Sequence, residues 1–101
     1  MDTLKATFDA TITGYTGEGL NGRAYLVHDP VLEIYTVFSV GYRQQRRVTD
    51  ANLIVRLMDN KVVIERDMND KPLADALIQA GIPRTQIILA YAGEPVPETT
   101  A

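Results

Sequence analysis

The chain has 101 residues, a formal net charge of −3 at pH 7 and no cysteine. This length suffices for one small domain, so we expect a single domain over residues 1–101 with a flexible tail at 93–101, where prolines and threonines collect. The acidic balance argues against direct binding of DNA by charge alone, and a chain without cysteine has neither disulfide bonds nor thiolate metal ligands.

The sequence also predicts where the protein is located. No apolar run approaches the ~18 residues that span a bilayer, so we expect no membrane association. The first residues lack the basic, apolar and small-residue order of a signal peptide. The expected location is therefore the cytoplasm.

Residues 1–15 carry two patterns at once. Their apolar side chains recur every four positions, as on one face of a helix, and they also alternate with polar residues, as in a strand. Threonines lower the helix propensity, whereas Gly14 is a suitable helix end. Periodicity alone favours helix and strand equally.

A glycine-rich loop is predicted at residues 14–22 and a strand at residues 23–28, which Asp29 and Pro30 end. The longest predicted strand covers residues 31–42. Bulky side chains occur on both of its faces, so this strand either lies in the centre of a sheet or presents one face to a partner.

A polar corner follows at residues 41–48, where Arg43, Arg46 and Arg47 lie close together in the sequence. Guanidinium groups bind carboxylates and phosphates through paired hydrogen bonds. Two interpretations stay open: the arginines contact an acidic partner, or they form a solvated hairpin loop that keeps a sheet edge soluble.

The clearest unit is a hairpin of residues 53–58 and 61–66 around Asp59 and Asn60. The pairs expected on one face are Leu57–Val62, Val55–Ile64 and Leu53–Arg66. The pairs expected on the other face are Met58–Lys61, Arg56–Val63 and Ile54–Glu65. A helix is then predicted at about residues 70–80, capped by Asn69 or Asp70 and ended by Gly81, and a short strand at 87–91.

The residues do not assemble a recognisable catalytic or metal site. His28 is the single histidine and lies beside Asp29, but the sequence places no serine or cysteine nucleophile near it. One histidine and scattered carboxylates do not make a metal-ligand set. We predict no catalytic residue, no metal and no cofactor, and keep a small enzyme centred on His28 and Asp29 as an alternative.

Several segments resemble the XisI-like family, whose members are named fdxN-element excision controlling factors and occur mainly in cyanobacteria. The similar segments are Tyr-Thr-Val-Phe-Ser-Val-Gly at 35–41, Arg-Arg-Val at 46–48, the hairpin at 59–65, Leu-Ile-Gln-Ala-Gly-Ile-Pro at 77–83 and Ile-Ile-Leu-Ala-Tyr at 87–91. The first segment of that family is a helix, so the resemblance favours a helix at residues 2–14. The expected fold is then α+β, an antiparallel sheet of about four to five strands with an N-terminal helix and the second helix (about residues 70–80) packed on it.

The resemblance implies a non-enzymatic accessory protein that acts with an XisH-like protein and a site-specific recombinase complex in excision of a DNA element. The apolar second face of the hairpin suggests a protein interface and a homo-oligomer. The residues expected to bind a partner are Ile54, Arg56, Met58, Val63, Glu65, Arg43, Arg46 and Arg47. The rival from another class is a DNA-contacting module that uses Arg23 with the three arginines of the polar corner.

Overall fold

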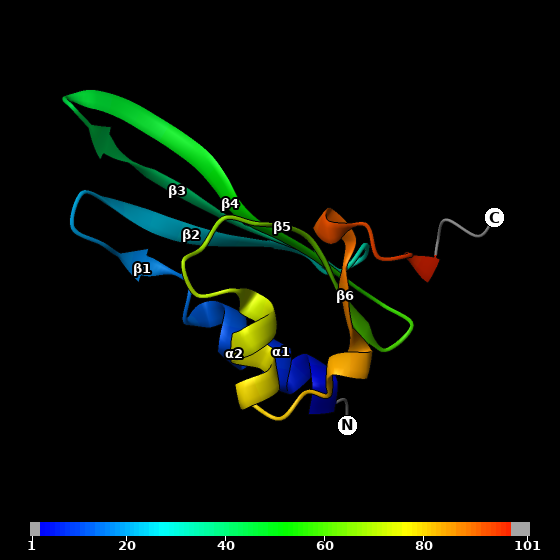
Figure 1. The fold of residues 1–101 in the computed structure, drawn as a ribbon. Coiled ribbons are helices and arrows are strands. Elements are labelled where there is room, and N and C mark those ends of the chain that lie inside the picture. Colours follow the sequence, from blue (N-terminus) through cyan, green and yellow to red (C-terminus); the bar gives the residue numbers. More distant parts are fainter. Residues whose placement is uncertain (1–2, 98–101) are drawn as a thin grey trace.

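The computed structural model describes residues 3–97 as one sheet with two helices on the same face (Figure 1). The helices are α1 (Thr3–Thr13) and α2 (Leu73–Gln79). The strands are β1 (Gly17–Glu18), β2 (Gly22–Asp29), β3 (Ile34–Arg43), β4 (Arg46–Met58), β5 (Lys61–Asp67) and β6 (Ile87–Leu89). Two single 3-10 turns, η1 (Arg84–Gln86) and η2 (Ala90–Ala92), flank β6.

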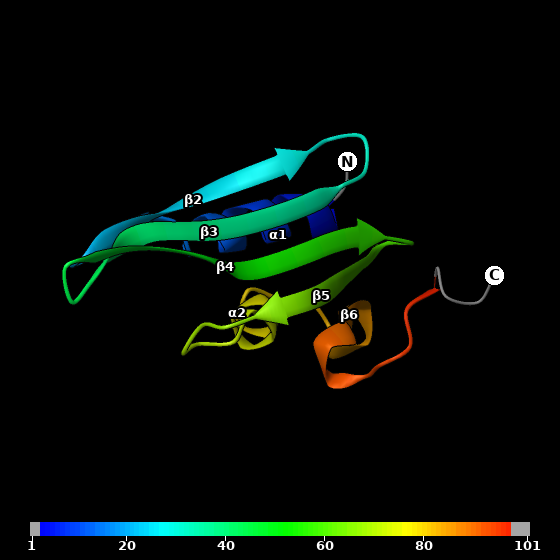
Figure 2. The same cartoon turned by 90° about the horizontal axis from the view of Figure 1, so that it is seen from above.

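The strands lie in the sheet in chain order, β1 to β6 (Figure 2). Neighbours are antiparallel except β5 and β6, which are parallel. The α+β class is confirmed, but the sheet is six-stranded and mixed where an antiparallel sheet of four to five strands was expected. The chain leaves β5, passes along the helix face as α2 and re-enters beside β5 in the same direction, which makes the last pair parallel.

The N-terminal segment is helical. Periodicity alone had favoured helix and strand equally there, and the helix that the family resemblance favoured is confirmed. Phe8 and Ile12 are fully buried against the sheet, and the Phe8 ring meets Tyr35 edge-on with centroids 4.7 Å apart. The hydroxyl of Thr11 donates to the Thr7 carbonyl one turn back, which satisfies a group that otherwise disfavours helix. Neither described helix combines the length and the apolar character that crossing a bilayer requires.

The core lies between the helices and the inner face of β3, β4 and β5. Its fully buried members include Phe8, Ile12, Leu53, Val55, Val62, Ile64, Leu73 and Leu77. Each such side chain contributes roughly 1.5–3 kcal/mol by leaving water. The short helix α2 depends on this burial because a helix of its length is marginal alone.

The β4–β5 hairpin has the predicted turn and most of the predicted register. Asp59 and Asn60 both adopt positive φ (51° and 59°), as a two-residue hairpin turn requires. The pairs Leu57–Val62, Val55–Ile64, Met58–Lys61 and Arg56–Val63 are confirmed. Beyond them a bulge at Glu65 shifts the register, so Ile54 faces Arg66 and Leu53 faces Asp67 instead of the predicted partners.

The end of the described chain packs on the sheet. Val96 is buried with Val63 and Ile88 on the face opposite the helices. The first part of the expected flexible tail, 93–97, is therefore packed, while 98–101 lie outside the described residues.

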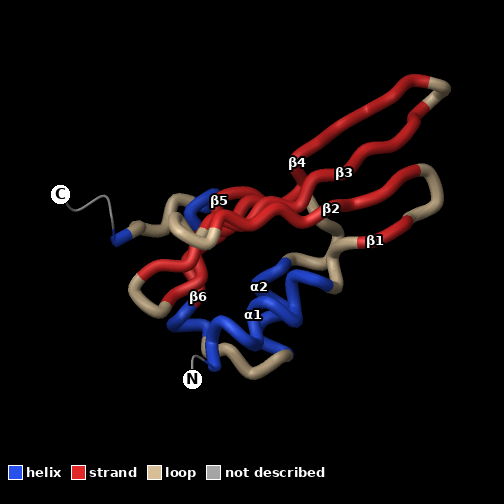
Figure 3. Tube along the Cα trace, turned by 180° about the vertical axis from the view of Figure 1, so that it is seen from behind, coloured by secondary structure: helices blue, strands red, loops and turns tan. Residues whose placement is uncertain are grey.

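Two hairpins extend past the ends of the helices (Figure 3). They are β1–β2 and the far half of β3–β4, joined side by side where Gly22 pairs with Gly41. A side chain at either glycine would collide with backbone of the opposite strand, so both positions need glycine for the strands to approach.

Candidate functional site

Burial divides the outer face of the sheet, opposite the helices, into a covered and an open part. Over β5 the segment from β6 to residue 97 lies on the sheet, and Val63 has no exposed surface because Ile88 and Val96 cover it. Over β2, β3 and β4 the ribbon views show no covering element. The part of this face that a partner can reach is therefore the part away from β5.

Five of the predicted partner-binding residues belong to the β4–β5 hairpin, and the structure separates them. Val63 is not part of the surface, because the chain's own C-terminal segment buries it, and Met58 packs against the same cluster. Arg56 and Glu65 form an ion pair of 3.0 Å between Nε and Oε2. Ile54 is half-buried on the open side, facing Arg66.

The open part carries a group of mostly apolar side chains, of which the sequence analysis singled out only Ile54. We define the open outer patch as Tyr25, Val27, Ile34, Thr36, Phe38 and Ile54, which share one face of β2, β3 and β4. Tyr25 stacks on Phe38 with ring centroids 5.3 Å apart. Tyr25 and Val27 are 43% and 55% exposed, so this group presents apolar surface to solvent.

The three arginines of the polar corner do not form one cluster. Arg43 and Arg46 face each other across the turn Gln44–Gln45, on the side of the sheet that carries the helices. Arg47 pairs with Tyr42 on the outer side. None of the three has an ion pair within residues 3–97, so this hairpin tip is positively charged and exposed.

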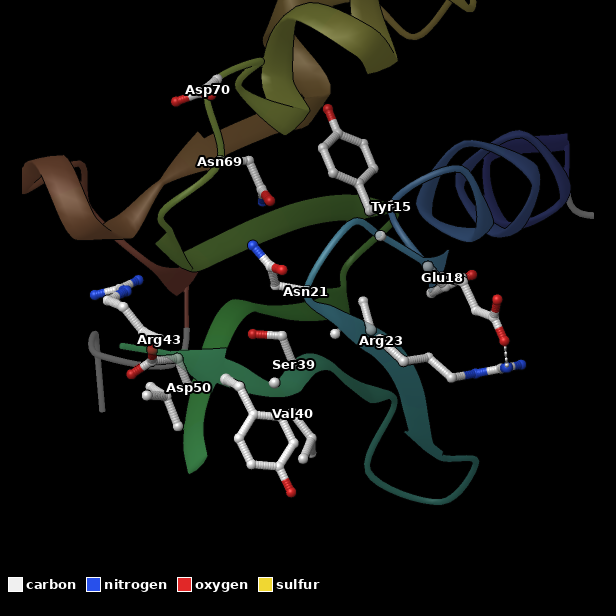
Figure 4. Close-up of a pocket in the computed structure, with 18 of the residues that line it drawn as sticks. Tyr15, Glu18, Asn21, Arg23, Ser39, Val40, Arg43, Asp50, Asn69 and Asp70 are labelled. Atoms are coloured by element: carbon white, nitrogen blue, oxygen red, sulfur yellow. Dashed lines mark hydrogen bonds and ion pairs between the residues drawn. The ribbon is translucent and has the colours of Figure 1, made fainter. Parts of the chain in front are cut away.

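A cleft of about 990 Å³ lies beneath the projecting hairpins, beside the end of α1 and the start of α2 (Figure 4). The Tyr15 hydroxyl closes one side by donating to the Lys71 carbonyl at 2.9 Å. Burial, followed by the nearby carboxylates of Asp67 and Asp75, raises the pKa of Tyr15.

The charges that line this cleft are mixed. Arg23 forms an ion pair of 3.1 Å with Glu18 and lies over the Tyr25 ring. The carboxylates of Asp50 and Asp70 line the same space. The cleft therefore concentrates no single charge that would select a phosphate or a cation.

Glu33 is the centre of a polar cluster that the sequence analysis did not find. Its Oε2 lies 2.7 Å from His28 Nε2, and its Oε1 accepts from Lys5 Nζ at 2.9 Å. The hydrogen bonds from Lys5 and then His28 lower the pKa of Glu33. Burial, with the Asp9 and Glu33 carboxylates next, raises the pKa of Tyr35.

His28 is held by this cluster and not by Asp29, the predicted partner. Its ring stacks on Tyr35, with centroids 3.9 Å apart, and Asp29 Oδ1 instead accepts from the backbone N–H groups of Val31 and Leu32. His28 lines neither the cleft beneath the hairpins nor a second, smaller cleft beside α1. The arrangement ties α1 to the β2–β3 hairpin, which is a structural role.

Among the residues that the structure describes, no three histidine or acidic side chains gather as a metal-binding set. The open outer patch has the mixture of exposed apolar and neighbouring polar side chains that is typical of protein interfaces. The signal for it was present in the sequence at residues 23–28, where both alternating faces of a strand carry apolar side chains.

Two solved structures share this fold. A XisI-like protein from Anabaena variabilis aligns with a TM-score of 0.62 at 20% identity, covering 95% of this chain and 84% of that one. The fdxN element excision controlling factor XisI from Anabaena variabilis aligns with a TM-score of 0.53 at 24% identity, covering 97% of this chain and 88% of that one. No curated protein shows a significant match to the chain.

The family model described as XisI protein matches residues 5–101, nearly the whole chain. The match includes every strand, α2 and most of α1. It confirms the resemblance seen in the hairpin and helix segments, and the chain belongs to the XisI family.

Proposed function

We propose that this protein is a non-enzymatic accessory factor in excision of a DNA element, acting by binding another protein. Family membership supports the role in excision, because one protein of the same fold is the fdxN element excision controlling factor XisI. The open outer patch supports action through another protein, because neither the helices nor the segment up to residue 97 buries this group of mostly apolar side chains, of which Tyr25 and Val27 are exposed.

The proposed partner is an XisH-like protein, in a complex that includes a site-specific recombinase. It docks on β2, β3 and β4, with Tyr25, Phe38 and Ile54 at the contact centre. Interfaces of this kind combine an apolar centre with a polar rim. Arg56 with Glu65 forms that rim toward β5, next to the part of the sheet that the chain covers itself.

The test introduces charged side chains into the patch without changing the net charge of the chain. Thr36 and Ile54 face each other across β3 and β4, so Thr36→Arg combined with Ile54→Asp introduces a facing ion pair that the fold accommodates. The matched control on the helix side is Ile78→Asp with Thr85→Arg, both at exposed positions.

The measurement is co-elution of each purified variant with an XisH-like protein in size-exclusion chromatography. We expect the wild type and the helix-side control to co-elute with the partner and the patch variant to elute alone. Circular dichroism confirms that both variants are folded. Co-elution of the patch variant at wild-type level would refute the patch as the binding surface.

A second candidate function rests on the exposed hairpin tip. A projecting two-stranded ribbon with Arg43, Arg46 and Arg47 free of ion pairs in the described chain has the shape and charge to enter a DNA groove. It predicts duplex binding, measured by fluorescence anisotropy, that weakens steeply with salt and is lost in Arg43→Ala with Arg46→Ala. Anisotropy that stays flat at low salt would exclude this second function.

A further inference from the structure

Strand β2 leaves part of its outer edge unpaired. Its neighbour β1 pairs only with Arg23 and Ala24, so residues 25–29 have no strand beside them on that side within the described chain. Figure 2 shows β2 as the border of the sheet there. Unpaired backbone groups at such an edge are a template for another strand.

The direction of the backbone groups on this edge follows from two hydrogen bonds. Gly19 N donates to the Gly22 carbonyl on the β1 side, and Tyr42 N donates to the Asn21 carbonyl on the β3 side. Because these directions alternate along a strand, the N–H and C=O groups of Leu26 and His28 point out from the free edge.

The side chains of this edge protect only its end. Natural sheets guard free edges with charged side chains, proline or a bulge. The free edge reads Tyr-Leu-Val-His-Asp, so its protecting charge, Asp29, stands at the last residue before Pro30, and the centre of the edge contains no lysine, proline or bulge. Leu26 is 38% exposed and Val27 is 55% exposed, so both faces of the strand carry apolar surface at the edge.

We propose that a second copy of this chain pairs with this edge, β2 against β2, around a two-fold axis at Val27. Leu26 then lies opposite His28 of the second copy, and by symmetry His28 lies opposite Leu26 of the second copy. Each of these pairs exchanges two backbone hydrogen bonds, and Val27 faces Val27 of the second copy between them. The two sheets join into one.

The occupant is a second copy because the edge complements itself. The free edge has Val27 at its centre, and only the register centred there pairs all of residues 25–29. In this register no two like charges face each other, and the Asp29 carboxylate meets the Tyr25 phenol of the second copy. The pairing uses the edge of β2, so Tyr25 and Val27 of the open outer patch lie at the seam, while the patch members on β3 and β4 remain accessible. Self-association is measured without any other protein, so its failure is distinct from a failure of the proposed function.

The first experiment changes the charge at the two-fold axis. The wild type is expected to sediment at twice the 11.2 kDa of one chain. Val27→Lys places two lysines opposite each other and is expected to weaken self-association by about a hundredfold, as is Val27→Glu. An equimolar mixture of the two variants is expected to dimerise again, because lysine then faces glutamate.

The matched control is Val31→Lys, which makes the same change at an 86% exposed position just past the paired edge and is expected to remain dimeric. Circular dichroism confirms folding of each variant. A monomeric wild type, a dimeric Val27→Lys variant, or a mixture that stays monomeric would each overturn the proposal.

A second experiment reads the register directly. The chain contains no cysteine, so Val27→Cys introduces a single thiol. In the proposed pair the two Cα atoms are about 4.5 Å apart, within disulfide range. Mild oxidation is expected to cross-link Val27→Cys into a dimer much faster than Val31→Cys, although the latter thiol is more exposed. Equal rates would contradict the two-fold axis at Val27.

Discussion

At the scale of single residues, Glu33 connects elements that the sequence separates. It follows β2 with a positive φ of 54°, and its carboxylate meets Lys5 of α1 and His28 of β2. A carboxylate whose pKa is lowered by folding stabilises the native state above its unfolded pKa. That contribution is lost as the pH falls through the folded pKa.

The substitution Glu33→Gln tests whether the stabilisation by this carboxylate decreases as the pH falls. At neutral pH the variant is expected to be less stable than the wild type by about 1 kcal/mol, since the interaction is charge-assisted but partly exposed to water. The difference is expected to shrink as the pH falls from the ordinary value of 4.5 toward the lowered pKa of the folded state, because Glu33 of the unfolded wild type then takes up a proton before Glu33 of the folded protein does. Urea unfolding at a series of pH values measures it.

The control for that series is Glu18→Gln, which removes the exposed ion pair between Glu18 of β1 and Arg23 of β2. Its effect is expected to be small at every pH. If the stability difference of Glu33→Gln stays constant on acidification, the carboxylate charge is not the origin of the effect.

At the residue scale, the side chain that binds the first N–H of α2 is that of Asp67, which the local capping rules did not predict. Asn69 and Asp70 are the nearest capping residues before α2, yet the Leu73 N–H donates to Asp67 Oδ2 at 2.7 Å. The same carboxylate also accepts from Asn69 N through Oδ1. The last residue of β5 thus fixes both the loop and the helix start, a geometry that depends on the path of residues 67–73 and not on spacing.

Asp67→Ala is therefore expected to cost about 1 kcal/mol of unfolding free energy, typical of a lost helix cap. Asp70→Ala, at the position that sequence rules favour, is expected to change stability by less than about 0.5 kcal/mol. Chemical denaturation of the two variants distinguishes them. Equal losses would show that Asp67 has no special part in starting α2.

At the scale of elements, the sequence predicted those helices and strands that depend on local features, namely hydrophobic periodicity and turn residues. The β4–β5 hairpin, its turn and the helix α2 follow from alternation, turn residues and the glycine at position 81. The bulge at Glu65 was not predictable, because alternation assumes one residue against one. Strand β1 escaped prediction because two residues carry no periodicity, and the parallel pairing of β6 depends on the route of the chain through α2.

The C-terminal segment is an element in its own right, and Val96→Asp tests its role. This change puts a carboxylate against Val63 and Ile88, so the segment is expected to detach at a cost of about 2 kcal/mol. Ala92→Asp, at an exposed position of η2, is the control and is expected to be nearly neutral. Thermal unfolding reports both. A Val96→Asp variant as stable as the control would mean that the segment does not cover β5.

At the scale of the whole molecule, the two faces of the sheet are covered to different extents. The helices close the inner face, and among residues 3–97 the segment from β6 to residue 97 covers the outer face over β5. The sequence predicted that the second face of the β4–β5 hairpin binds a partner, and Ile54 and Arg56 do lie on that outer face, whereas their binding of a partner stays a prediction. It could not exclude Val63, because the contact between residues 63 and 96 joins distant segments that no local pattern relates.

The proposed function requires that a protein partner binds at the open outer patch. Hydroxyl-radical footprinting of the chain with and without an XisH-like protein tests it most directly, because it reports exposure of individual side chains. We predict that Phe38 and Ile54 lose reactivity in the complex while Ile78 and Tyr91 keep it. Protection of Ile78 with unchanged Phe38 and Ile54 would contradict the claim.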